Sequence, residues 1–320
     1  MPAALEFQEV SKVYPGADAP AVDRLSLRVE PGETCMLVGP SGSGKTTAMR
    51  MVNRMVEISD GDILLDGQSV RGRNPAELRR HIGYVIQHVG LFPHRTVLQN
   101  IGTVPQLLGW PKERIARRAR ELVELVGLEP SLAERYPGQL SGGQRQRVGV
   151  ARALAADPPL MLMDEPFGAL DPITRDRLQA EFVRLKERLQ TTIVFVTHDI
   201  DEAIRLGDRV AVLRDGALVQ YAAPGELLLH PADSFVEDFV GADRALKRLA
   251  LLRVADAELE SGDGGDGPAL SPSTSLRDAL AALLQDPGGR LPVVDGDRPL
   301  GALTVDAVRA RLRDEAGVAS

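Results

Sequence analysis

The chain has 320 residues, 43% of them hydrophobic and 26% charged, so it can bury a core and is neither wholly disordered nor collagen-like. Its length favours two domains, or one domain with a substantial appendage. The formal net charge of −7 and the pI of about 5.4 provide no whole-protein basic field, which argues against nucleic acid as a partner.

The single cysteine, Cys35, cannot form an internal disulfide, which suits a reducing compartment, and we interpret it as a small buried hydrophobe. The sequence has no window of roughly 20 apolar residues of the kind that spans a bilayer. The N-terminal MPAALEFQEVSK lacks the basic start and the apolar stretch of a signal peptide. We therefore expect a cytoplasmic location.

Short apolar runs alternate with longer helical patterns up to about residue 240, which predicts an α/β architecture. Several of the expected strands are apolar nearly throughout, as central parallel strands buried on both faces tend to be. Asp215-Gly216 lies between two alternating runs and predicts a hairpin over 208–221. The other expected strands are 5–10, 34–39, 82–87, 159–164 and 192–197, and the expected helices are 45–55, 112–126, 142–156, 172–189 and 199–206.

The C-terminal part has a different composition. Residues 261–275 are rich in Gly, Ser, Pro and Asp and predict a mobile loop. A helical pattern, LRDALAALL, follows, and then two apolar runs flank Asp295-Gly296. We expect a small separate α/β unit here.

Residues 39–46, GPSGSGKT, fit the pattern G-x-x-x-x-G-K-[ST] between an apolar run and a helical pattern. Glycines allow the backbone N–H groups to approach a polyphosphate, and the following helix points its positive end toward the same place. Lys45 would neutralise the β- and γ-phosphates, and the Thr46 hydroxyl would bind Mg²⁺. The pattern predicts a site for a nucleoside triphosphate without naming its use.

The apolar run PLMLM ends in two carboxylates, Asp164 and Glu165, which is a Walker B pattern. Consecutive strand residues point in opposite directions, so the two carboxylates can serve different tasks. We expect Asp164 to hold Mg²⁺ and Glu165 to activate water.

Leu140-Ser-Gly-Gly-Gln144 opens a helical pattern, and Ser141 by itself fits a plain N-cap. Between the two preceding motifs, however, this pentapeptide resembles the signature of ATP-binding cassette (ABC) ATPases. The resemblance covers residues 1 to about 240 and implies a P-loop NTPase fold with a helical subdomain. It also implies that Gln87 senses Mg²⁺ and the attacking water, that Asp171 belongs to the D-loop, that His198 is the switch histidine, and that Tyr14 stacks on adenine.

The motifs and the resemblance together assign a full set of site residues. The catalytic residues are Lys45, Gln87, Glu165 and His198, and the expected Mg²⁺ ligands are Thr46, Gln87 and Asp164. The nucleotide-binding residues are Tyr14, Gly39, Pro40, Ser41, Gly42, Ser43, Gly44, Lys45, Thr46, Thr47, Ser141, Gly142, Gly143, Gln144 and Asp171.

In this family two ATPase chains meet head to tail. The phosphate-binding loop 39–46 of one chain, called the cradle below, then faces Ser141 to Gln144 of the other, and ATP closes the interface. Stretches such as VIQHVGLFPH (85–94) and FGALDPITR (167–175) resemble the ATPase subunits of bacterial importers for glycine betaine, choline or carnitine. The resemblance implies membrane permease subunits as partners, an indirect link to a substrate-binding protein, and a place at the cytoplasmic face of the inner membrane. Residues 87–95 would lie near the coupling helix of the permease. An ABC ATPase of another small-solute importer, or one outside transport, is the alternative.

Residues 241–310 resemble a single cystathionine-β-synthase (CBS) module, with 311–320 as a tail. Relatives commonly carry two such repeats. Thr304-Val-Asp306 is one residue shorter than the usual ending Thr-x-x-Asp, which argues against a ribose-phosphate contact by Asp306. The module is interpreted either as a ligand sensor or as a pairing or vestigial unit.

Overall fold

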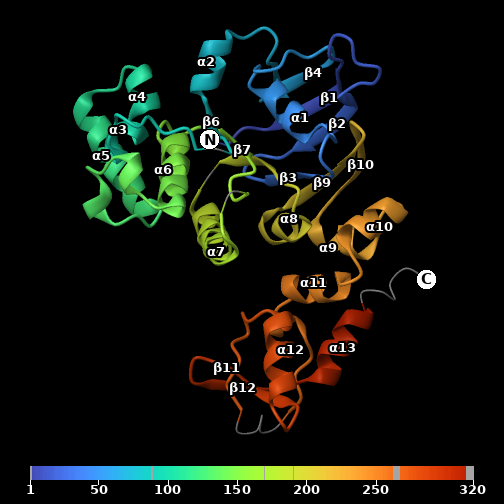
Figure 1. The fold of residues 1–320 in the computed structure, drawn as a ribbon. Coiled ribbons are helices and arrows are strands. Elements are labelled where there is room, and N and C mark those ends of the chain that lie inside the picture. Colours follow the sequence, from blue (N-terminus) through green and yellow to red (C-terminus); the bar gives the residue numbers. More distant parts are fainter. Residues whose placement is uncertain (1, 88, 169, 190, 262–266, 315–320) are drawn as a thin grey trace. The chain divides into compact units, whose positions relative to one another are not determined.

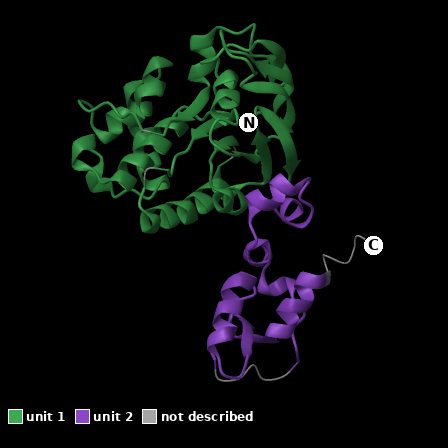
Figure 2. Ribbon diagram, turned by 45° about the vertical axis from the view of Figure 1, so that its right-hand side comes forward, with its two compact units in different colours: residues 1–222 green, residues 223–320 purple. Residues whose placement is uncertain are grey.

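The computed structural model describes residues 2–87, 89–168, 170–189, 191–261 and 267–314. The chain divides into two compact units, Met1–Ala222 and Ala223–Ser320 (Figure 2). Helices α9 (Pro224–Leu229) and α10 (Ser234–Val240) thus fall in the second unit. A domain boundary between residues 240 and 241 stays a prediction.

The larger sheet of the first unit has six strands in the order β10-β9-β3-β8-β7-β6. Its central strands β3 (Thr34–Val38), β7 (Leu160–Asp164) and β8 (Thr192–Val196) are buried at every residue and pair in parallel, as their apolar runs predicted. Strand β6 (Ile82–Val85) continues the parallel set, and β9 (Arg209–Arg214) and β10 (Ala217–Ala222) form the predicted hairpin. Cys35 lies on β3, fully buried, and burial raises the pKa of its thiol to about 12.

A second, antiparallel sheet has the strand order β2-β1-β4-β5. Only β1 (Leu5–Lys12) among these was expected; β2 (Val22–Val29), β4 (Asp60–Leu65) and β5 (Gln68–Ser69) were not. Glu9 and Arg24 have positive φ values of 47° and 43°, and the β1–β2 register shifts beside them. The bulge at Arg24 interrupts the alternation of buried and exposed residues near the start of β2, on which a strand prediction depends. One apolar core joins this sheet to α1 and to buried residues of the parallel sheet.

Five helices of the first unit match the predicted ones within a few residues. They are α1 (Lys45–Val52), α5 (Lys112–Leu125), α6 (Gly142–Leu154), α7 (Pro172–Arg188) and α8 (Ile200–Leu206). The short helices α2 (Pro75–Arg80), α3 (Val97–Ile101) and α4 (Thr103–Leu107) and the 3-10 turns Pro130–Leu132 and Pro137–Gln139 were not predicted. Helices α3 to α6 gather on one side of the unit (Figure 1). This group matches the helical subdomain that the sequence implied.

The second unit continues with α11 (Arg244–Leu251), the 3-10 turn Val254–Asp256, α12 (Leu276–Gln285), β11 (Arg290–Asp295), β12 (Arg298–Thr304) and α13 (Val305–Asp314). It has its own apolar core, to which Leu276, Leu291 and Leu303 contribute. Residues 262–266 of the predicted mobile loop lie outside the described residues. Among the helices that are described, none is both long enough and apolar enough to cross a membrane.

Candidate nucleotide site

The loop 39–46 turns between β3 and α1 and leaves its amide groups available. Within the described residues, the backbone N–H groups of Ser41, Gly42 and 44–47 have no hydrogen-bond acceptor. Helix α1 has no side-chain cap and no acidic residue in its first turn. An N-terminal turn without these partners is suited to an anion such as a polyphosphate. Ser43 is buried, whereas Pro40 and Ser41 are exposed and Thr47 is half-buried.

Two glycines of the loop are required by their surroundings. A Cβ atom on Gly39, whose φ is 145°, would lie 2.1 Å from the Leu213 carbonyl oxygen. On Gly44, at φ 93°, a Cβ atom would lie 2.3 Å from the Ala21 carbonyl oxygen. No other residue type fits either position without moving the backbone.

The Lys45 ammonium is held by the loop itself. Its Nζ atom donates to the carbonyl oxygens of Gly39, at 2.8 Å, and Pro40, at 2.7 Å. Burial lowers the pKa of Lys45, and the nearby carboxylates Glu165 and Asp164 oppose this effect. A phosphate entering the loop would therefore meet a cation that is already positioned.

Asp164 ends β7 against the first turns of α1. The Thr46 hydroxyl donates to Asp164 Oδ1 at 3.1 Å, and Arg50 Nη2 lies 3.4 Å from Oδ2. Burial raises the pKa of Asp164, while Thr46 and Arg50 act in the opposite direction. A hydroxyl and a carboxylate in contact are oxygen ligands of the kind that Mg²⁺ uses beside substrate phosphates, so these two residues fit that ion.

Arg50 was not among the predicted site residues. It lies four positions after Thr46 on α1, a spacing that places both side chains on one face of the helix. This spacing was the signal that the sequence offered. The sequence did not show that Asp164 faces the same side of the helix.

Two of the predicted residues contact the same carboxylate oxygen of Glu165. Gln87 Nε2 donates to Glu165 Oε2 at 3.3 Å, and His198 Nδ1 lies 3.3 Å from the same atom. Glu165 has a positive φ of 42°, uncommon for a residue with a side chain and a form of strain often found at functional sites. The structure thus gathers Gln87, Glu165 and His198 beside Asp164.

The other predicted residues lie elsewhere in the chain. Ser141 and Gln144 form a capping box at the start of α6: Ser141 Oγ accepts from the Gln144 N–H at 3.2 Å, and Gln144 Oε1 accepts from the Ser141 N–H at 2.8 Å. Helix α6 lies with α3 to α5, away from α1 (Figure 1). The N–H groups of Gly142 and Gly143 have no acceptor within the described residues.

Asp171 and Tyr14 are also exposed. Asp171 caps α7 by accepting from the Thr174 N–H at 3.0 Å, and this hydrogen bond lowers the pKa of Asp171. Tyr14 is 40% exposed, and Lys12 Nζ lies 5.1 Å from its ring centroid.

The fold and the cradle therefore define a nucleotide-binding cassette as the class of protein. Comparisons with known proteins identify the family. The family model described as "ABC transporter" matches residues 22–168. The choline transport ATP-binding protein OpuBA of Bacillus subtilis is 48% identical over 299 residues, covering 92% of this chain and 77% of that protein. The glycine betaine uptake system ATP-binding protein YehX of Escherichia coli is 49% identical over 300 residues, 93% of this chain and 97% of that protein. The chain belongs to the ABC transporter family, among its ATP-binding subunits.

Further matches agree. The glycine betaine/carnitine/choline transport ATP-binding protein OpuCA of B. subtilis is 56% identical over 243 residues, 76% of this chain but 64% of OpuCA, so the chain spans less than two thirds of that relative. The structure resembles the dimeric ATP-binding cassette MJ0796 bound to ADP and Pi, with a TM-score of 0.61, 33% identity, and coverage of 69% of this chain and 98% of that one. The predicted family and fold class are thereby confirmed.

Gly39→Ala is expected to weaken ATP binding at least tenfold and to lower the free energy of unfolding by roughly 1–3 kcal/mol, because the methyl group collides with the Leu213 carbonyl oxygen. Titration with a fluorescent ATP analogue and urea unfolding measure the two effects. Gly72→Ala is the control, since a Cβ atom there meets nothing within 4 Å and needs no positive φ. Equal behaviour of the two variants would contradict the steric argument.

Glu202 supplies a pH-dependent prediction. It is buried on α8, its Oε1 accepts from Gln179 Nε2 at 2.9 Å, and burial raises its pKa above the ordinary 4.5. The folded chain then holds a proton that the unfolded chain has lost, so the stability that Glu202 contributes is present below pH 4.5 and is lost as pH rises through the folded pKa. Glu202→Gln should remove this pH dependence of stability. The melting temperature of the variant should therefore rise relative to that of wild type as the pH increases from 4.5 through the folded pKa.

The measurement is thermal unfolding in a pH series, with the exposed Glu187→Gln on α7 as the control. A Glu202→Gln difference that does not vary with pH would exclude the burial effect.

Proposed function

We propose that the chain is the ATP-hydrolysing subunit of an importer for quaternary-amine osmoprotectants of the glycine betaine, choline and carnitine class. The observation that carries the enzymatic part is the convergence of Gln87 and His198 on Glu165 Oε2, both at 3.3 Å, beside the phosphate cradle. The solute class is supported by the names of the relatives OpuCA, OpuBA and YehX.

In this proposal each residue has one task. The free amides of the cradle and Lys45 bind and orient the β- and γ-phosphates of ATP, with Tyr14 against the adenine. Glu165, oriented by Gln87 and His198, accepts the proton of the attacking water, and His198 stabilises charge at the γ-phosphate. Thr46, Asp164 and Gln87 would hold Mg²⁺, which supplies charge neutralisation of the phosphate oxygens.

The free N–H groups of Gly142 and Gly143 support a composite site. We propose that they meet the nucleotide in the cradle of a second chain, since an amide pair at the start of a helix suits a phosphate. Asp171 would lie at the same interface. The dimeric solved cassette MJ0796 supports this arrangement.

A groove in the first unit supports docking to a permease. It has a volume of about 200 Å³ and is lined by residues that include Met55, Val104 and Arg152, and Met55 is 52% exposed. Arg152 donates to the carbonyl oxygens of Gly90 at 2.7 Å and Val89 at 2.6 Å, so it ties the segment predicted to lie near the coupling helix to the groove. His88 of that segment lies outside the described residues. Docking there would place the chain at the cytoplasmic face of the membrane, with a substrate-binding protein linked only through the permease.

For the second unit we propose a single CBS-like module at residues 241–310, supported by α12, the β11–β12 hairpin and α13 around one core. The Thr304 hydroxyl accepts from the Ala307 N–H at 3.2 Å and donates to Glu260 at 3.2 Å, and Asp306 pairs with Arg309 at 3.1 Å. Both side chains thus have partners within the unit. This favours a pairing or vestigial module over a ligand sensor.

Uptake of labelled glycine betaine, choline and carnitine tests the whole proposal in cells lacking the gene. Wild type and Glu187→Gln should restore uptake, and Glu165→Gln should reduce uptake, and ATP turnover by the assembled transporter, at least 100-fold, because no carboxylate remains to take the proton from water. Full turnover by Glu165→Gln would refute the assigned base. Turnover without uptake of any of the three solutes would instead refute the solute class.

A mixing experiment tests the composite site. Lys45→Ala and Ser141→Arg should each abolish ATP turnover by the transporter, because each disables both sites of a homodimer. In a head-to-tail dimer of the two variants, one site carries both lesions and the other carries neither. Turnover should therefore reappear when the variants are mixed, and continued inactivity of the mixture would exclude sites shared between chains.

A further inference from the structure

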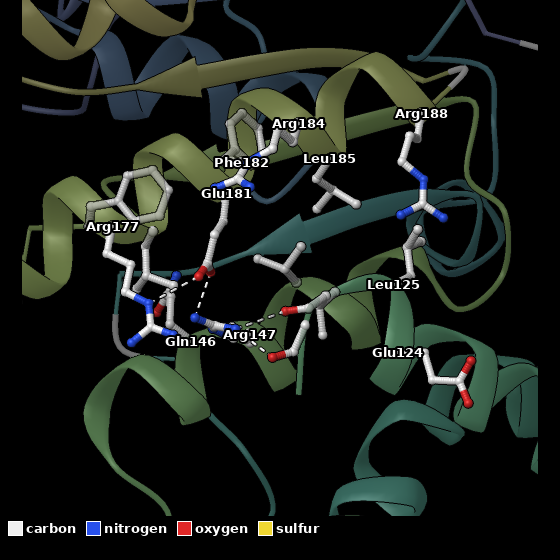
Figure 3. A pocket seen from close by; sticks show the side chains of 15 residues that line it. Glu124, Leu125, Gln146, Arg147, Arg177, Glu181, Phe182, Arg184, Leu185 and Arg188 are labelled. Carbon is white, nitrogen blue, oxygen red and sulfur yellow. Dashed lines mark hydrogen bonds and ion pairs between the residues drawn. The ribbon is translucent and has the colours of Figure 1, made fainter. Parts of the chain in front are cut away.

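The first unit contains a second cavity, of about 360 Å³, between the end of α5, α6 and α7 (Figure 3). We call it the α6–α7 pocket. Its volume lies within the range of ~300–1,000 Å³ that is usual for small-molecule sites. None of the residues assigned to the nucleotide site lines it.

Apolar side chains form the wall of the α6–α7 pocket, and one buried amide interrupts them. Phe167, Leu178, Phe182 and Leu185 are each less than 9% exposed. Gln146 is 4% exposed, and its Nε2 atom has no hydrogen-bond partner in the described part of the chain. A buried donor without a partner costs free energy, so an acceptor supplied by a ligand would stabilise it.

The charge at the rim is positive. The carboxylate of Glu181 already forms ion pairs, since it lies 2.5 Å from Arg147 Nη2 and 3.2 Å from Arg177 Nε. Arg184 and Arg188 project from α7 along the same side (Figure 3), and neither has a carboxylate partner among the residues described. Glu124 is the only other carboxylate in the described lining. Four arginines against two glutamates favour an anion over a cation.

We propose that the α6–α7 pocket binds an organic anion with a flat apolar body, of the aromatic carboxylate or sulfonate class. The aromatic part packs against Phe167 and Phe182, the anionic group pairs with Arg184 and Arg188, and an acceptor atom of the ligand receives Gln146 Nε2. A transported quaternary amine does not fit this charge pattern.

The position of the pocket gives its ligand an effect on catalysis, an inference that rests on the proposed function. Phe167 is two residues after Glu165, and its ring contacts those of Phe182 and Phe195 at centroid distances of 6.2 and 5.8 Å. Gln146 is two residues after Gln144 of the signature pentapeptide. A ligand that packs between α6 and α7 therefore acts on the segments that carry both the proposed base and the proposed trans contact.

Fluorescence titration of the full chain with 8-anilinonaphthalene-1-sulfonate tests binding. ADP is present in excess to fill the cradle. We expect one site per chain, with the dissociation constant raised at least tenfold in the double variant Arg184→Glu, Arg188→Glu and at least threefold in Gln146→Met. Lys112→Glu, Arg120→Glu is the matched control, because it makes the same charge change at exposed positions of α5 that do not line the pocket.

Equal affinities for the pocket and control variants would overturn the proposal, as would the absence of saturable binding while ADP fills the cradle. Competition by 1-naphthoate supports the ligand class, whereas complete competition by inorganic phosphate or by choline at the same concentration contradicts it.

The second arm measures ATP turnover by the assembled transporter with and without 1-naphthoate. A change of at least twofold in wild type that is absent in Arg184→Glu, Arg188→Glu supports coupling, and no change refutes coupling. Binding is scored without turnover, so failure of the proposed function leaves the test of the pocket intact.

Discussion

The parallel pairing of β3, β7 and β8 is the constraint on which the nucleotide site depends. Leu37 and Asp164 both lie opposite Val196 in the sheet register, so the three strands end at the same level. The cradle follows β3, Glu165 directly follows β7, and His198 lies two residues after the end of β8. Three segments far apart in the sequence thereby meet at one sheet edge, which is where ligands bind in open α/β sheets.

At that edge the charges are compensated within the chain. Lys45 is held by two carbonyl oxygens of its own loop, and Asp164 is held by Thr46 and Arg50. A bound phosphate would accept from the Lys45 ammonium in place of these carbonyl oxygens, without first ordering a mobile lysine. Because the polar groups are positioned before the ligand arrives, less reorganisation is needed during the reaction. The strained backbone of Glu165, at φ 42°, lies at the same edge and is likewise set by the fold before a ligand binds.

The buried parallel strands and the longer helices could be predicted because their sequence patterns are local. Strands β2 and β4 could not. The bulge at Arg24 interrupts the alternation near the start of β2, and both strands are stabilised by antiparallel pairing with β1, which is not a local signal. The residue types of the site could be predicted from motifs. Their geometry could not: the shared contact of Gln87 and His198 with Glu165 joins three segments through tertiary packing. Gln146 gave no signal in the sequence, because a buried amide without a partner is visible only in three dimensions.

Ser141 shows why a structural and a functional interpretation of one residue need not exclude each other. The capping box uses the Ser141 hydroxyl and the N–H of Gln144, the third residue of α6, so it satisfies one free amide of the helix end. It leaves the amides of Gly142 and Gly143 unpaired within the described residues. A Cβ atom on Gly143 would lie 3.1 Å from Thr174 Cγ2 on α7, so this position also favours a small residue. The cap thus orders the first turn of α6 while two donors stay available, and a phosphate group of a second chain's nucleotide has the charge that such a helix end stabilises.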